Sequence, residues 1–229
     1  VFAPENRWGI FPSMSLGWVV SEENFFKEAL PFVDYFKIRA SYGESGNDNV
    51  TAFLYNSNYG TSTNSMVFGG TPITQFYAEN AYIYRNLTWA TTHSWNLGFE
   101  FDLWNRKLGV ELDLFYQLTE DILESASGNY PTSLGGYYPS YRNSGKVDNK
   151  GFELTLKHIN RVNKDFNYKL NGTLSFARNR VLSKAVADNY PNYRGVLGHS
   201  MGARYGYKAL GLFQSQEEID NYPAAPSGS

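Results

Sequence analysis

Residues 96–121, NLGFEFDLWNRKLGVELDLFYQLTED, alternate almost without error between apolar and polar side chains. Successive side chains on a β-strand point to opposite faces, so this stretch predicts strands with one apolar and one charged face. A tight turn at residues 105–107 would join them into a hairpin. Two environments fit such a hairpin. In the first, the apolar face covers a protein core and the charged face meets water. In the second, the apolar face contacts lipid and the charged face lines a wet lumen.

The composition excludes several classes of protein. The 229 residues suffice for one large domain or two small ones, and 17% of them are aromatic and 18% charged. No run approaches the roughly 18 apolar residues of a membrane-spanning helix, which excludes a helical membrane protein and leaves a membrane barrel open. Cysteine is absent, so no thiolate site is possible. The net charge of -2, with scattered basic residues, gives no reason to expect a nucleic-acid partner.

The links between the predicted strands are as informative as the strands. Further candidate strands with the same alternation are residues 13–20, 35–43, 152–159 and 166–178, with a weaker one at 203–213. Short links alternate strictly with long ones, which are residues 44–93, 121–144 and 179–203. Most links in a compact soluble domain have about 4–6 residues, whereas an outer-membrane barrel has short turns on one side and long loops on the other. The pattern favours an all-β, antiparallel transmembrane β-barrel section with long outer loops. A soluble antiparallel sheet with one wet face remains the alternative.

Five segments, taken together, resemble a known family. RWGIFPSMSLGWVVSEENFF at 7–26 is followed by FKIRASYGESGN at 36–47, and the hairpin region extends this set over 86–123. NSGKVDNKGFELTL at 143–156 and GHSMGARYGYKALGLFQSQEEI at 198–219 complete it in the same order. These segments resemble the SusC-like (SusC/RagA) branch of the TonB-dependent outer-membrane receptors. They cover most of the chain outside the long links.

The resemblance implies a function as well as a fold. Such receptors import oligosaccharides or peptides through a barrel of about 22 strands in the outer membrane of Gram-negative, Bacteroidetes-type bacteria. They work with a SusD-like surface lipoprotein and with the TonB complex, and they need no cofactor. Residues 1–229 would be a partial barrel domain of roughly seven or eight strands from the C-terminal half, without the plug domain. Ala90 and Ser200 stand where the family usually has Glu and Pro, which leaves the strand pattern intact.

Two groups of residues are candidates for a functional site. The first comprises polar side chains expected to face the lumen, with opposite signs on neighbouring strands, where ion pairs would suit a wet interior and anchor a plug. Its members are Lys37, Arg39, Glu100, Asp102, Glu111, Asp113, Glu153, Lys157 and Lys169. The second is the loop sequence GGYYPSY with Tyr137, Tyr138 and Tyr141. These rings could stack on a sugar or peptide substrate, or pack against other loops or the partner lipoprotein.

No catalytic or metal site is predicted. His93, His158 and His199 lie in different segments, without an i, i+4 partner or a nearby carboxylate pair. The pieces GESGNDN and SGKVDNKG lack the Lys-Ser/Thr pair of a phosphate loop and the final Glu of a calcium loop, so turn chemistry explains them. Two functions therefore remain, a section of a transporter and a soluble all-β carbohydrate-binding module. An enzyme is not expected.

Overall fold

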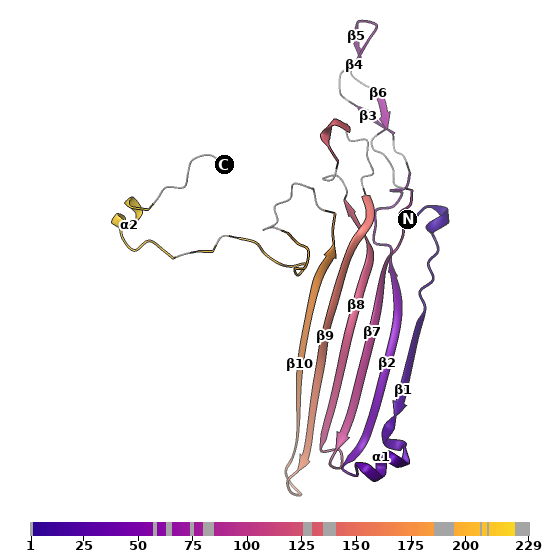
Figure 1. The fold of residues 1–229 in the computed structure, drawn as a ribbon, viewed down its shortest axis with the longest axis vertical. Helices are drawn as coiled ribbons and strands as arrows, with labels where there is room; N and C mark the ends of the chain where they lie inside the picture. Colours follow the sequence, from indigo (N-terminus) through magenta and orange to yellow (C-terminus); the bar gives the residue numbers. More distant parts are fainter. Residues whose placement is uncertain are drawn as a thin grey trace.

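One antiparallel sheet of six long strands dominates the structure (Figure 1). The computed structural model describes residues 2–56, 59–62, 66–73, 76–79, 85–125, 130–134, 141–185, 195–206, 208–209 and 211–222. The strand order is β1-β2-β7-β8-β9-β10, so each long strand pairs with the next long strand along the chain. Their bounds are β1 Ser13–Val19, β2 Val33–Asn47, β7 Ala90–Leu103, β8 Leu108–Ser125, β9 Tyr141–Arg161 and β10 Asn167–Ser183. This meander is the connectivity of an up-and-down barrel.

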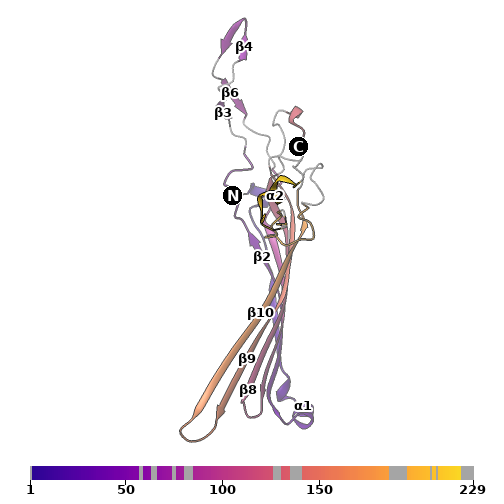
Figure 2. The ribbon, with the colours of Figure 1, turned by 90° about the vertical axis from the view of Figure 1, so that its left-hand side faces the viewer.

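The two ends of the sheet carry connections of different length, as the sequence predicts. At the lower end in Figure 1 lie the 3₁₀-helix η2 (Val20–Glu22), the helix α1 (Asn24–Ala29) and the tight turns after β7 and β9. At the upper end, the connection between β2 and β7 carries two small two-stranded sheets. These pair β3 (Tyr59–Ser62) with β6 (Phe76–Glu79), and β4 (Met66–Phe68) with β5 (Thr71–Ile73). Figure 2 shows the twist of the sheet, whose strands fan apart toward the short-turn end.

The turn between β7 and β8 has an unusual backbone. Trp104, Asn105 and Arg106 all have positive φ, at 56°, 55° and 59°, which is uncommon for residues other than glycine. The side chain of Asp34 supports this conformation, because its Oδ2 accepts a hydrogen bond of 2.9 Å from the Arg106 backbone N–H. The turn closes where Lys107 N–H donates to the Leu103 carbonyl at 3.0 Å. The predicted hairpin at 96–121 is therefore confirmed.

Apart from β1, which ends at Val19, the observed long strands extend beyond the alternating segments that predict them. The segment predicted at 152–159 is the lower part of β9, which spans 21 residues, and the segment at 35–43 lies inside the 15 residues of β2. The weaker candidate at 203–213 is wrong, because its described residues form no strand. They lead into the short helix α2 (Gln216–Asp220) and run away from the sheet in Figure 1.

A small packed cluster ties the N-terminal segment to the upper end of the sheet. Phe2 and Leu87 are buried, and the ring of Trp89 lies 5.2 Å from that of Phe2 and 5.5 Å from that of Phe11. The Phe11 ring also occupies the space where a side chain at Gly46 would begin, so any larger residue at Gly46 would displace it. This contact gives a physical reason for Gly46, the second glycine of the segment SYGESGN.

Candidate functional site: the polar face of the sheet

The register of the sheet separates two faces with different chemistry. Opposite one another on one face lie Phe36 and Phe101, Ile38 and Phe99, and then Leu97 and Leu114. The alternate positions hold the polar side chains, so Arg39 lies opposite Gly98, and Gly98 opposite Asp113. We call these the apolar face and the polar face.

Arg39 is the centre of the polar face. Its Nε lies 2.7 Å from Glu100 Oε1 on β7, and its Nη2 lies 3.1 Å from Asp113 Oδ1 on β8. The guanidinium reaches the second strand because Gly98, between them, has no side chain. A Cβ at Gly98 would stand 2.8 Å from Asp113 Oδ1 and 2.9 Å from Arg39 Nη2. One cation therefore bridges two carboxylates on two strands.

A third ion pair lies lower on the same face. Lys157 Nζ on β9 approaches Glu111 Oε1 on β8 to 2.5 Å. Lys157 lies opposite Gly109 in the β8–β9 register, where the absence of a glycine side chain leaves room for the long lysine side chain. The three ion pairs together join four consecutive strands, β2, β7, β8 and β9.

The expected opposite charges on neighbouring strands occur between β2 and β7, where Lys37 lies opposite Glu100, but the expectation is wrong for the next strands. Glu100 lies directly opposite Glu111, and Asp113 lies directly opposite Glu153, so β7, β8 and β9 bring like charges together. Like charges in this position are destabilising. The cations that compensate them come from positions offset along the strands, Arg39 on β2 and Lys157 on β9. Sequence alternation assigns residues to a face but not to cross-strand partners, which depend on register.

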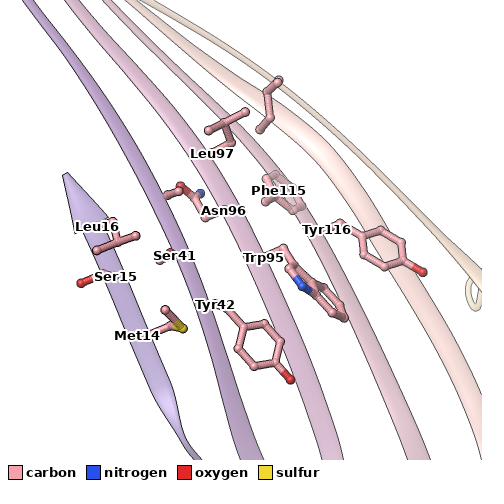
Figure 3. A pocket seen from close by; sticks show the side chains of 12 residues that line it. Met14, Ser15, Leu16, Ser41, Tyr42, Trp95, Asn96, Leu97, Phe115 and Tyr116 are labelled. Atoms are coloured by element: carbon pink, nitrogen blue, oxygen red, sulfur yellow. The ribbon is translucent and has the colours of Figure 1, made fainter. Parts of the chain in front are cut away.

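The apolar face remains open to its surroundings. Leu16, Leu174 and Phe176 are each more than half exposed, at 70%, 58% and 57%. A shallow groove of about 490 Å³ crosses β1, β2, β7 and β8 on this face (Figure 3). The rings of Tyr42, Trp95 and Tyr116 lie side by side there, with centroids 5.3 Å and 5.4 Å apart. A contiguous exposed apolar face of this extent requires a partner or a lipid environment.

Near the upper end, charged side chains replace the apolar ones on the same face, and the sequence analysis did not single them out. Asp148, which is 1% exposed, accepts from Arg180 Nε at 3.2 Å and Nη2 at 2.5 Å. Lys146 forms an ion pair with Glu120. The signal in the sequence is the end of the apolar alternation in β9 above Phe152, which marks where the environment of this face changes.

The remaining predicted site residues have mixed outcomes. Tyr137 and Tyr138 lie outside the described residues, whereas Tyr141 is the exposed first residue of β9 and lies opposite Ser125. His93 is not isolated as expected, because its ring nitrogens lie 3.5 Å from Glu44 Oε1 and 3.7 Å from Glu120 Oε2. The described part of the chain nevertheless contains no group of three or more His, Cys, Asp or Glu placed to hold a metal. None of its helices is long and apolar enough to cross a bilayer.

The sheet has the features of the wall of a transmembrane β-barrel. Its strands are long and antiparallel, its connections are alternately short and long, and it has one exposed apolar face and one ion-paired polar face. Comparison with known families shows to which protein family this barrel wall belongs. The family described as "TonB dependent receptor-like, beta-barrel" matches residues 2–224, so the chain belongs to it.

Individual relatives are consistent with this family. The chain is 34% identical over 220 residues to TonB-dependent receptor P39 of Formosa agariphila, covering 93% of this chain and 20% of that protein. It is 26% identical over 234 residues to TonB-dependent receptor SusC of Bacteroides thetaiotaomicron, covering 96% of this chain and 22% of that protein. The chain thus spans about a fifth of the length of the curated relatives it matches.

Solved structures show the same fold. The RagAB peptide importer in its "closed-closed" state matches with a TM-score of 0.66 at 20% identity, over 86% of this chain and 21% of that one. Its "open-open" state matches with a TM-score of 0.65 at 22% identity, over 79% of this chain and 19% of that one. The predicted family and the predicted fold class, an antiparallel barrel section, are confirmed.

Proposed function

We propose that the chain is part of the barrel wall of an outer-membrane, TonB-dependent importer that takes up oligosaccharides or peptides. The observation that carries this proposal is the two-faced sheet in a member of the receptor family. In a closed barrel the apolar face points outward to lipid, so the polar face lines the lumen. The Arg39 and Lys157 ion pairs then cover the inner wall, where they offer charged partners to a plug domain.

The relatives suggest the partners and the class of substrate. SusC is named among the curated relatives and RagAB, a peptide importer, among the solved structures. We therefore assign to the complete receptor a SusD-like surface lipoprotein at the long-loop end and the TonB complex on the opposite side. The residues on which this proposal rests form ion pairs and line a lumen. The proposed function is therefore transport, without a catalytic step. Family membership favours this function over a soluble carbohydrate-binding module.

The first test concerns the location of the complete receptor that carries this section. Cells expressing it would be fractionated, and the protein would be run heated and unheated on a denaturing gel. We expect recovery in the outer membrane and a band that shifts on heating. Recovery as a soluble protein without a shift would contradict the proposal.

The second test concerns uptake. A strain lacking the receptor would be complemented with wild type or with a Tyr137→Ala, Tyr138→Ala, Tyr141→Ala variant and grown on candidate glycans or peptides as sole nutrient. We expect slower growth from the variant at equal receptor levels if the aromatic loop contacts substrate or lipoprotein. Phe166→Ala, at the short-turn end, serves as the matched control. Equal growth of all three strains would remove the loop from the proposal.

A further inference from the structure

A single row of cross-strand neighbours on the apolar face changes from aromatic to basic. Tyr42, Trp95 and Tyr116 are successive partners on β2, β7 and β8. The same row continues to Lys150 on β9 and Arg178 on β10, because Tyr116 lies opposite Lys150 and Lys150 opposite Arg178. Tyr and Trp are enriched where a membrane protein crosses the boundary between hydrocarbon and water. The two cations therefore lie at this boundary if the apolar face contacts lipid.

Lys150 and Arg178 form a like-charge pair without a direct ion-pair partner in the described ranges, and the carboxylate that acts on Lys150, Asp148, is held by Arg180. Side chains directly opposite each other on an antiparallel pair lie about 5 Å apart at Cβ, and like charges there repel. In the described ranges, no carboxylate oxygen lies within ion-pair distance of either residue. Their basic neighbours Arg180 and Lys146 are already engaged, with Asp148 and Glu120 respectively. Both Lys150 and Arg178 are exposed, so an external anion can reach them.

An apolar track runs down the sheet directly below this pair. The next pairs on the same face are Phe152 with Phe176, whose ring centroids are 6.2 Å apart, and then Leu154 with Leu174. Below them Leu156 lies opposite Gly172, where a Cβ would have nothing within 4 Å. The track is thus exposed, and its lower end is widened by the missing side chain.

Two cations at the boundary above an open apolar track are complementary to an amphiphile that has a phosphate head and acyl chains. We propose that Lys150 and Arg178 bind the phosphate of a membrane lipid whose chains lie along Phe152, Phe176 and the leucines below. Arginine suits this role because its planar guanidinium binds phosphate oxygens in pairs. The phosphate belongs to a glycolipid or to a phospholipid, and the experiment separates the two. The inference depends on the proposed location in the outer membrane.

The test uses the complete receptor in nanodiscs of phosphatidylcholine, where a heat-shifted band first verifies that each variant is folded. Binding of lipid A, of its dephosphorylated form and of phosphatidylglycerol would be measured by native mass spectrometry and by competition. The variants are Lys150→Gln with Arg178→Gln, and the charge-preserving Lys150→Arg. Lys164→Gln, in the turn at the other end of the sheet, is the matched control.

We expect wild type, Lys150→Arg and Lys164→Gln to retain the phosphorylated lipid, and the double Gln variant to bind it about 30-fold more weakly, as the loss of two interfacial cations implies. Loss of binding on dephosphorylation shows that phosphate is recognised. Weaker binding of phosphatidylglycerol than of lipid A then identifies a glycolipid, and equal binding of the two identifies phosphate in general. Equal retention by wild type and the double variant would overturn the proposal and would indicate that the pair is neutralised by the protein. Failure of the heat shift in wild type would instead contradict the proposed function.

Discussion

The guanidinium of Arg39 lies 3.1 Å from the carboxylate of Asp113, although the two residues are 74 positions apart and one strand stands between them. The contact exists because Gly98, on the intervening strand, has no side chain. A missing side chain on β7 therefore determines an ion pair between β2 and β8. This relationship leads to the first prediction.

Replacing Gly98 by valine should separate Arg39 from Asp113. The groups in the way are the ends of flexible side chains, so they can move, and the main cost is the lost ion pair. After allowance for partial exposure we expect a coupling of about 0.5–1 kcal/mol between Gly98→Val and Asp113→Asn. A double-mutant cycle measured by urea unfolding of the complete receptor in lipid vesicles checks this. Strictly additive effects would show that Gly98 does not mediate the pair.

Replacing Arg39 by glutamine should destabilise the barrel more than replacing Lys37, which precedes it by two residues on the same face. The loss of Arg39 leaves Glu100 and Asp113 without their ion-pair partner, and Glu100 still lies opposite Glu111. Because the remaining repulsion is electrostatic, added salt should reduce the deficit. The temperature of the heat shift would be measured at low and high salt. A deficit that is independent of salt, or that Asp113→Asn fails to reduce, would contradict this explanation.

Replacing Gly151 by alanine should destabilise the sheet, whereas the same change at Gly172 should not. A Cβ at Gly151 would overlap the backbone carbonyl of Phe176 and stand 2.7 Å from the Phe115 ring, and a backbone cannot move aside as a side chain can. We expect a cost of about 1–3 kcal/mol at Gly151. At Gly172, with nothing within 4 Å, alanine should be neutral or slightly stabilising. Equal unfolding midpoints for the two variants would refute this prediction.

Replacing Trp95 by alanine should lower stability in lipid by about 1–3 kcal/mol, because the indole contacts the rings of both Tyr42 and Tyr116. Trp8→Ala serves as the control, since Trp8 is 89% exposed. Unfolding in urea from phosphatidylcholine vesicles would measure both. A Trp95 variant as stable as the Trp8 variant would show that the row of rings contributes no packing energy.

The faces, the short turns and the alternation of link lengths were determined by the sequence alone. The period of two is a local property, so residues such as Phe99 and Glu100 are assigned to opposite faces without knowledge of their partners. The tight turn after Leu103 follows from a local break in that period. The five segments that resemble the receptor family are also readable without coordinates.

Only the tertiary structure decided which side chains meet and where each strand ends. The repulsive pair of Glu100 and Glu111, the position of Arg39 between two carboxylates and the row that joins Tyr116 to Lys150 all depend on cross-strand register. Register depends on turn geometry and on how whole strands pair, which the alternation within one strand does not specify. The strands also continue beyond their alternating parts, up to Tyr141 in β9. The physical reason is that backbone pairing needs no particular side chains, whereas alternation persists only where the two faces meet different environments.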